Sequence, residues 1–219
     1  TQTGSAYKVY TPFSRAFAEL SIPAPARCSG KPIPPDSWPG GIVPKDIELV
    51  EQEKVCSGIS DTWKPDRASG LAELREFVSK RVGDYADARD IPGEKGTSRI
   101  SPYLRWGQIG PREVVAALQG APESNGRTVY HKELLWREFA YHVLYHFPDT
   151  VESPLQRGYD KFPWRSDATQ LERWKSGLTG FPIVDAGMRE LAQTGWMHNR
   201  VRMITGSFLV KHLLHSWKE

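Results

Sequence analysis

From Ser69 onward, apolar residues recur three and four positions apart, the spacing at which side chains share one face of an α-helix. No stretch alternates apolar and polar residues as a half-buried β-strand does. Residues 196–217 carry the clearest helical pattern, with Gly195 ending the preceding element and Asn199 as a suitable helix cap. The apolar positions of this stretch are Val201, Ile204, Phe208, Leu209 and Leu213. The sequence therefore predicts an all-α fold.

Proline, glycine and hydroxyl residues mark where the other helices begin and end. Thr11 followed by Pro12 predicts the cap and first turn of a short N-terminal helix. Two further predicted helices cover 69–82 and 128–147. Three more are predicted to start at 102, 111 and 182, and a short one is predicted to end at 177. Their apolar faces, predicted to point inward, include Leu144 and Ile183.

The composition suits a folded domain, because 39% of the 219 residues are hydrophobic. A net charge of +3 favours anionic partners only weakly. Cys28 and Cys56 are too few for a disulfide framework and lack metal-site spacing, which predicts a reduced, cytoplasmic location. No apolar run approaches the length of a membrane span. Eight tryptophans are unusually many. Four of them are interpreted as packing residues: Trp38, Trp63, Trp106 and Trp174.

Residues 21–46 contain seven prolines and three glycines, a composition that predicts an irregular connector rather than part of a core. A connector near the start of a folded unit usually joins two domains. We therefore predict a short helix and interdomain linker over 1–65 and a helical domain over 66–219. The partner domain is expected to precede this stretch.

Residues 93–101 place glycines, three hydroxyl side chains and Arg99 directly before the helix start predicted at Pro102. Backbone N–H groups and hydroxyls at a helix N-terminus can hold a phosphate. A well-capped helix with an exposed loop explains the same residues, so both interpretations stay open. Arg200 and Arg202 oppose the dipole at the start of the last helix, which favours an anion nearby.

Glu138, His142 and His146 fall four residues apart on the 128–147 helix, a spacing that could bind a divalent metal. His212 and His215 are the only paired partners available, and no cysteine or carboxylate cluster accompanies them in the sequence. We therefore predict solvated or hydrogen-bonded histidines and no metal site.

Four motifs resemble those of the DNA photolyase and cryptochrome family in type, order and spacing. They are Gly-Thr-Ser-Arg-Ile-Ser at 96–101, Trp-Arg-Glu-Phe at 136–139, Phe-Pro-Ile-Val-Asp-Ala-Gly-Met-Arg at 181–189 and Thr-Gly-Trp-Met-His-Asn-Arg-Val-Arg-Met at 194–203. The similarity runs from about Tyr7 to the last residue. The chain looks most like part of a class I cyclobutane pyrimidine dimer photolyase, with the linker and the first part of the FAD-binding helical domain present.

The resemblance implies that the helical domain holds FAD and that the reduced, light-excited flavin donates an electron to a pyrimidine dimer flipped out of ultraviolet-damaged DNA. The FAD ligands implied by resemblance are Tyr85, Thr97, Ser98, Arg99, Ile100, Ser101, Arg137, Trp196, Asn199 and Arg202. The residues implied at the dimer, where the reaction takes place, are Glu133, Trp136, Asn199 and Met203. The implied DNA contacts are Arg89, Glu133, Trp136, Arg137, Asn199 and Arg200. Trp164 and Trp217 match two of the tryptophans that pass electrons to the flavin.

Two departures from the family pattern bear on these expectations. The α/β antenna domain of the family has no counterpart here, so a second chromophore is unknown. Flavin-contacting carboxylates and the tryptophan nearest the flavin would follow Trp217-Lys218-Glu219, which we expect to lie in the middle of a helix. The parent protein is predicted to be monomeric and active. The fragment alone is predicted to be inactive, either poorly folded or packed with a copy of itself, because Arg202 lacks its carboxylate partner.

Two alternative functions stay open. A cryptochrome-like blue-light photoreceptor would share the flavin site, although Glu133, Trp136 and Met203 favour a pocket that repairs dimers. A flavin-free helical DNA-binding module is suggested by the positive charge and the arginine-bearing pocket. Tests for bound flavin and for repair of damaged DNA distinguish the photolyase, the photoreceptor and the DNA-binding module.

Overall fold

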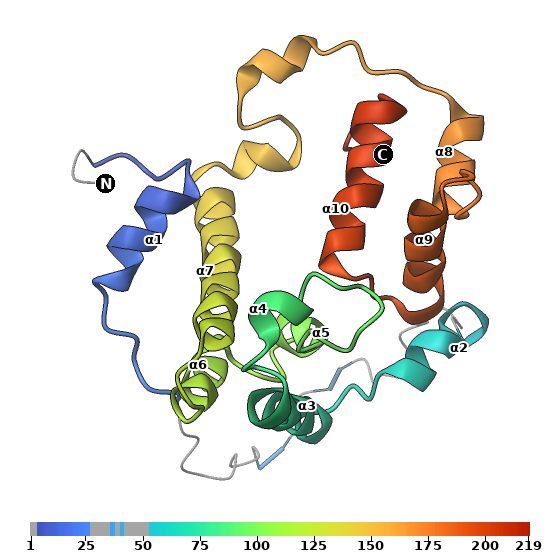
Figure 1. The fold of residues 1–219 in the computed structure, drawn as a ribbon. Coiled ribbons are helices and arrows are strands. Elements are labelled where there is room, and N and C mark those ends of the chain that lie inside the picture. The colour runs from blue at the N-terminus through green and yellow to red at the C-terminus, as the bar shows by residue number, and fades with distance from the viewer. Residues whose placement is uncertain (1–3, 27–35, 38–39, 42–52) are drawn as a thin grey trace.

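The computed structural model describes residues 4–26, 36–37, 40–41 and 53–219, with side chains described from Gly58 onward in the last range. Within these residues the chain is helical, and extended segments pair only at an isolated bridge between Arg165 and His215. The helices, shown in Figure 1, are α1 (Tyr10–Ala18), α2 (Glu53–Thr62), α3 (Arg67–Lys80), α4 (Tyr85–Ala88), α5 (Ser101–Arg105), α6 (Pro111–Gln119), α7 (Asn125–His146), α8 (Ala168–Lys175), α9 (Pro182–Thr194) and α10 (Asn199–Ser207). The all-α prediction is confirmed.

Three short elements complete the description. The 3₁₀ turns η2 (Pro148–Val151) and η3 (Arg157–Lys161) lie between α7 and α8, and a π-helical turn, η4 (Phe208–His212), follows α10. Predictions about Cys28 and Trp38 lie outside the described residues, as does the side chain of Cys56. Among the residues that the structure describes, no helix is both long enough and apolar enough to cross a membrane.

Capping groups set the starts of α3 and α7, which begin earlier than their apolar patterns predict. The Asp66 carboxylate caps α3 by accepting the Ser69 N–H at 2.7 Å. The Ser124 hydroxyl caps α7 by accepting the Arg127 N–H at 3.1 Å. Helix α1 begins before Thr11, so the prediction that this threonine is the cap is wrong.

The end of the chain differs most from its predicted helix. His198 caps α10, because its Nδ1 atom accepts the Arg200 N–H at 3.2 Å, so Asn199 is the first helical residue and not the cap. The sequence predicted a helix that continues through the last residue, and this is wrong. The helical segment ends earlier, because Leu214 has a left-handed backbone with φ of 59°. Its carbonyl accepts the Arg165 N–H at 2.8 Å, which holds the turned chain against the segment before α8.

Helix α2 lies within the range predicted as linker, where the sequence shows no strong apolar periodicity. It packs against the end of α9: a Cβ added to Gly58 would lie 2.1 Å from the Gln193 carbonyl oxygen. Just after α2, the Trp63 indole donates to the Thr194 carbonyl at 2.7 Å. Residues 53–63 therefore contact the helical domain directly.

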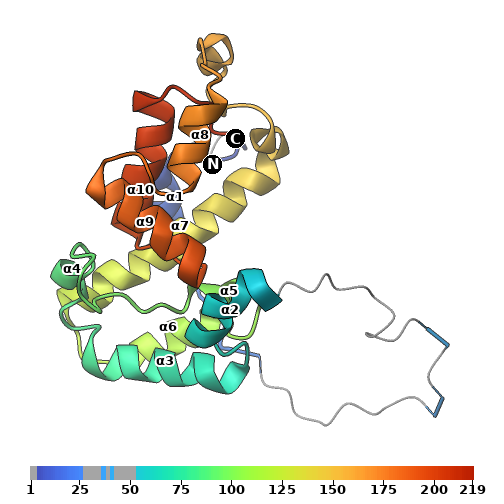
Figure 2. The same ribbon diagram turned by 90° about the vertical axis from the view of Figure 1, so that its right-hand side faces the viewer.

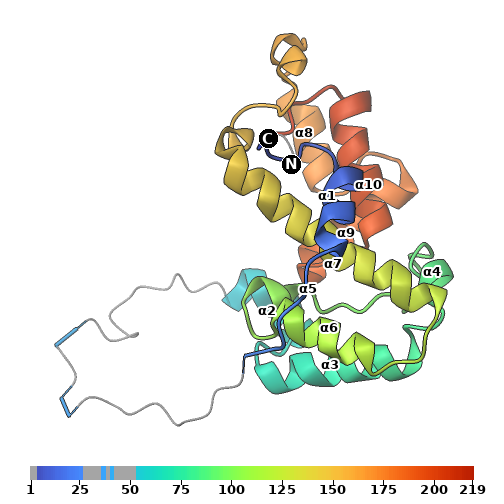
Figure 3. The same cartoon turned by 90° about the vertical axis from the view of Figure 1, so that its left-hand side faces the viewer.

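Two hydrophobic cores organise the molecule, one around α3 and α6 and the other around α9 and α10 (Figure 2). The buried residues of the first are Leu74, Phe77, Val82, Tyr85, Ile100, Tyr103, Ile109, Val114, Leu118, Ala121, Tyr130 and Leu134. Those of the second are Val184, Met188, Met197, Val201 and Phe208. Helix α7 starts in the first core and extends beyond it, with α1 lying along one side (Figure 3).

Several side chains predicted to be buried are exposed instead. Leu144 on α7, Ile183 on α9 and Ile204 on α10 are 47%, 44% and 42% exposed, because no described element covers these faces. Trp106, interpreted as a packing residue, is 77% exposed, whereas Trp63 and Trp174 pack against the cores as predicted.

The start of α6 depends on one carboxylate. Glu113 accepts the Gly110 N–H at 2.8 Å and an Arg67 guanidinium N–H at 3.0 Å. The Arg67 hydrogen bond, with help from Gly110, lowers the pKa of Glu113 from 4.5 to about 2. Because the folded-state pKa is depressed, this stabilisation is present above about pH 4.5 and is lost as the pH falls through about 2.

We expect Glu113→Gln to lower the Tm by about 2 °C at pH 7, because it removes the ionised capping group. The difference from the unmodified protein should vanish near pH 2. Thermal unfolding followed by circular dichroism between pH 7 and pH 2 measures both, and Glu94→Gln, at an exposed position, is the control. A Tm difference that is constant over this pH range would contradict the assignment.

Candidate functional site

The predicted site residues come from the loop before α5, from α4, α7 and α10, and from three loop tryptophans, Trp164, Trp196 and Trp217. The loop over 96–101 lies directly against the end of α4. A Cβ added to Gly96 would lie 2.3 Å from the Ala88 carbonyl oxygen and 2.5 Å from its carbonyl carbon, so glycine is required for this approach. Within the same loop Arg99 has a left-handed backbone, with φ of 53°.

Side chains of this loop alternate between the core and the surface. The Ser98 hydroxyl is buried and accepts the Tyr130 hydroxyl at 2.8 Å, and Ile100 is fully buried in the first core. Thr97 is half-buried and its carbonyl accepts Arg81 at 3.2 Å, whereas Ser101 is exposed. Of the predicted phosphate ligands in the loop, the Thr97 and Ser101 side chains are therefore the more accessible.

Arg99 and Trp196 form a cation–π pair that joins the loop to the segment before α10. The guanidinium carbon lies 4.4 Å from the Trp196 ring centroid and 5.3 Å from that of Trp63. The Arg99 Nε atom is buried and has no hydrogen-bond partner among the described residues. Tyr85, the remaining ligand predicted at this end, is buried, with its ring edge-on to Phe77 and Tyr130, and burial raises its pKa to about 12.

Ser101 and Arg137 line one cavity of about 260 Å³ between α5 and α7, with Tyr141 and Leu144 on its wall. Arg137 is tied to its neighbour, because its Nη1 donates to Glu138 Oε1 at 2.6 Å, and its guanidinium lies 4.7 Å from the Tyr141 ring centroid. The structure thus brings two of the predicted cofactor ligands together on facing elements.

A chain of ion pairs joins α7, the end of α4 and the start of α10. Arg89 pairs with Glu133 and lies 3.5 Å from Asp90. Arg200 holds Asp90 with two hydrogen bonds, at 2.7 and 2.9 Å, which lower the pKa of that carboxyl. Arg200 is the more accessible of the two arginines, with a side chain 42% exposed against 16% for Arg89.

The first turns of α10 present polar groups outward over a buried histidine. The Asn199 amide lies 3.9 Å from the Met203 sulfur, and Met203 is 57% exposed. Arg202 is exposed, and no ion pair of the described residues includes it. His198 is buried beneath them, its pKa is lowered mainly by burial, and its Nε2 atom lacks a partner among the described residues.

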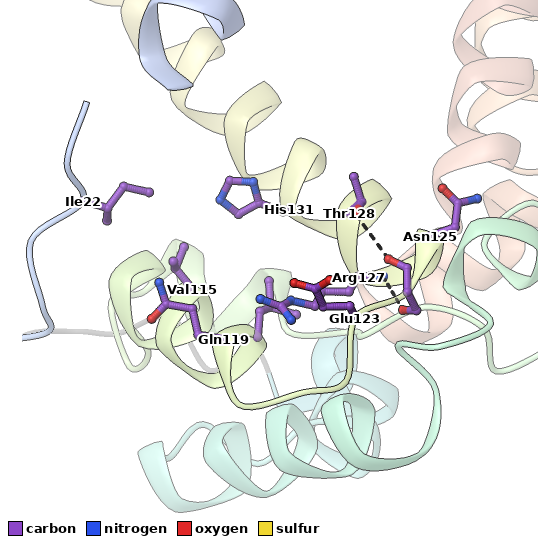
Figure 4. A pocket seen from close by; sticks show the side chains of 10 residues that line it. Ile22, Val115, Gln119, Glu123, Asn125, Arg127, Thr128 and His131 are labelled. Carbon is purple, nitrogen blue, oxygen red and sulfur yellow. Dashed lines mark hydrogen bonds between the residues drawn. The ribbon is translucent and has the colours of Figure 1, made fainter. Parts of the chain in front are cut away.

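Met203 lines a second cavity of about 630 Å³ over α9, α10 and η4, separate from the one at Arg137. A further cavity of about 640 Å³ lies between α6 and the start of α7, near Ile22 (Figure 4). Its walls carry Glu123, Arg127 and His131, and none of the predicted site residues lines it. The predicted site residues that line a cavity are therefore divided between two separate cavities, and this third cavity is not part of the predicted site.

Trp164 and Trp217 lie on two segments that are paired by the backbone bridge between Arg165 and His215. Trp164 is half-buried and its ring lies 4.4 Å from that of Phe162, whereas Trp217 is 42% exposed. The bridge joins these two segments although they are about fifty residues apart in sequence.

The structure describes no cluster of three or more histidine, cysteine or acidic side chains that could hold a metal within its described residues. His142 accepts the Tyr7 N–H at 3.0 Å, and Glu138 is paired with Arg137. Sequence reasoning missed Asp90, which links the two arginines. The only signal for Asp90 in the sequence is its place next to Arg89. That signal is weak, because a carboxylate beside an arginine is common on any surface.

Together these features define a helical domain whose predicted site residues lie in the loop before α5, on α7 and at the start of α10. Residues 130–219 match the family model described as the FAD binding domain of DNA photolyase. The chain is 41% identical to the deoxyribodipyrimidine photo-lyase of Agrobacterium fabrum over 224 residues, covering 100% of this chain and 47% of that protein. It is 37% identical to the Escherichia coli photo-lyase, covering 97% of this chain and 46% of that protein.

Solved structures agree. A bacterial class III photolyase from Agrobacterium tumefaciens superposes with a TM-score of 0.92 at 41% identity, covering 100% of this chain and 46% of that one. A cryptochrome from Synechocystis sp. PCC6803 gives a TM-score of 0.67 at 33% identity, over 71% of this chain and 34% of that one. The chain has the fold of the photolyase and cryptochrome proteins, and its residues 130–219 match the FAD-binding domain of DNA photolyase. It spans about half the length of the relatives it matches.

Proposed function

We propose that the protein carrying this chain is a deoxyribodipyrimidine photo-lyase, which splits cyclobutane pyrimidine dimers in DNA with light and reduced FAD. The observation that carries the proposal is on α7, where Glu133 and the 48% exposed Trp136 lie one turn apart. A carboxyl group for the edge of an extruded base and an aromatic platform for its face are the groups that such a site needs.

The residues present fit FAD on their chemistry. The Thr97 and Ser101 hydroxyls can donate to phosphate, and the cations of Arg202 and Arg99 can balance its charge. The buried, unpartnered Arg99 Nε supports a ligand beside this loop. FAD, when bound and reduced, supplies a light-excited electron donor. Ser98, Ile100 and Tyr85, which are buried, would then support the loop rather than contact the cofactor with their side chains.

The arginines of the ion-pair chain would take different parts in DNA binding. Arg200, the more exposed, is proposed to contact a phosphate while it keeps Asp90 as a partner. Arg89 is proposed to hold the Glu133 carboxylate through their ion pair and so orient it toward the base. Arg137, Asn199 and Met203 complete the proposed contacts to cofactor and dimer.

Trp164 and Trp217 are proposed to exchange an electron when the cofactor is photoreduced, because indole can be oxidised transiently and the backbone bridge holds their segments together. The proposed division into a linker over 1–65 and a helical domain over 66–219 would need to include α2 in the helical domain, since α2 packs on α9. A monomeric state and a cytoplasmic location also remain proposals.

A cryptochrome-like photoreceptor is the second candidate, favoured by the structural likeness to the Synechocystis cryptochrome. The class I assignment made from the motifs stays a prediction, while the Agrobacterium structural neighbour is named a class III photolyase. Glu133 and Trp136 favour repair over signalling, because a photoreceptor has no need of a base-reading carboxyl and platform.

Flavin absorbance and DNA binding in the dark separate these candidates. We expect the whole protein to purify with flavin and to bind an oligonucleotide with one thymine dimer at least tenfold more tightly than its undamaged match. Flavin without this preference would favour the cryptochrome, and DNA binding without flavin would favour the simple DNA-binding module. Fluorescence anisotropy at fixed salt measures the preference.

A further inference from the structure

Tyr10 of α1 lies flat against Trp136 of α7. Their ring centroids are 3.6 Å apart and the rings are inclined by only 6°. Phe139 meets both rings edge-on, at 5.9 Å and 76° in each case. An indole held between a parallel ring and a perpendicular one has few ways to turn, since both contacts are among the favoured geometries of aromatic pairs.

The hydroxyl of Tyr10 fixes the ring from its other end. It donates to the Lys132 carbonyl at 3.2 Å, one turn before Trp136 on the same helix. Burial and the negative charge of Glu133 raise the pKa of Tyr10, so the phenol stays protonated and remains a donor at neutral pH. Tyr10 is therefore attached to α7 by its ring and by its hydroxyl.

Only one face of the indole is covered by this stack. Helix α7 lies between α1 and α10 in Figure 1, so α1 packs on the side of α7 that is away from α10. Trp136 nevertheless stays 48% exposed. The stack therefore leaves indole surface open to a ligand and closes the surface that faces α1.

We propose that Tyr10 is a positioning residue for damaged DNA: it backs the Trp136 indole so that an extruded pyrimidine stacks on the opposite face. This assignment rests on the proposed function. A platform already held in one orientation loses less rotamer freedom when a base stacks on it, which strengthens binding without any contact between Tyr10 and DNA. The effect should be specific for DNA with an extrudable dimer, since undamaged duplex is held through its phosphates.

The test compares Tyr10→Leu, Tyr10→Phe and Phe17→Leu in the whole protein, with binding to dimer-containing and undamaged oligonucleotides as the readout. We expect Tyr10→Leu to weaken binding to the dimer about 3- to 10-fold, from the size of aromatic pair energies, and to leave undamaged DNA unchanged. Tyr10→Phe keeps the stack and should lose less than about 2-fold. Phe17→Leu loosens the packing of α1, where Phe17 lies 5.8 Å from Phe13, without touching the stack, and should have no effect on DNA.

A double-mutant cycle decides whether Tyr10 acts through Trp136. In a Trp136→Ala background, Tyr10→Leu should cause no further loss. Equal losses in both backgrounds, or a loss with Phe17→Leu as large as that with Tyr10→Leu, would overturn the proposal.

¹⁹F NMR of protein labelled with fluorotryptophan follows the stack without DNA, and the Trp136 signal should shift and broaden in Tyr10→Leu. If the unmodified protein does not prefer dimers while this signal shifts, the proposed function fails; if it prefers dimers and Tyr10→Leu binds them as tightly as the unmodified protein, only the role of Tyr10 fails.

Discussion

Gly96→Ala is expected to remove most of the bound flavin and to lower the free energy of unfolding by about 2–3 kcal/mol. The added Cβ would lie 2.3 Å from the Ala88 carbonyl oxygen and 2.5 Å from its carbonyl carbon, distances that backbone atoms cannot accommodate without moving. The loop over 97–101 must then shift away from α4. Since this loop carries the hydroxyls proposed to hold the cofactor phosphates, the shift should weaken flavin binding more than it weakens the fold.

Gly93→Ala is the matched control, because the same loop offers a glycine with no atom within 4 Å of the added Cβ. Flavin content after gel filtration and urea unfolding of both variants measure the two effects. Flavin retained by Gly96→Ala at the level of Gly93→Ala would show that the loop does not hold the cofactor. A loss of stability without loss of flavin would leave only a structural role for Gly96.

Trp136→Ala is expected to weaken binding to dimer-containing DNA by about 10- to 100-fold, because stacking of one base on an aromatic side chain contributes about 1–3 kcal/mol. Binding to undamaged DNA should change by less than about 2-fold, and flavin content should not change. The half-exposed position of the indole means that little core packing is lost with it.

Trp106→Ala provides the control, since this tryptophan is 77% exposed and lies on another element, after α5. It should bind both oligonucleotides as the unmodified protein does. Fluorescence anisotropy at fixed ionic strength compares the variants. If Trp136→Ala and Trp106→Ala bind dimer-containing DNA equally well, Trp136 is not the platform for the base.

Most of the fold could be predicted from the sequence, because apolar spacing and punctuation by proline and glycine report local structure directly. Gly195, for example, ends α9 in the left-handed conformation, with φ of 68°. The errors arise where distant groups decide the outcome. Leu214 turns the chain in a position held by Arg165, and Ile183 stays exposed because no described element packs over it.

The site was predicted residue by residue from the family motifs, and these assignments stay predictions. What the motifs could not reveal is how the charges pair. Asp90 joins Arg89 to Arg200, and Tyr10 stacks on a tryptophan more than a hundred residues away in sequence. Such contacts depend on the packing of α4 and α1 against α7, which no local pattern encodes.

Light-driven repair is the most direct test of the proposed function. The whole protein, with its flavin reduced, is mixed with an oligonucleotide that carries one thymine dimer and is illuminated with near-ultraviolet or blue light, and intact and split dimers are separated by chromatography. The proposal predicts that dimers are split in the light, that none are split in the dark, and that Trp136→Ala lowers the yield at limiting protein. Bound, reduced flavin with dimers left intact after illumination would contradict it.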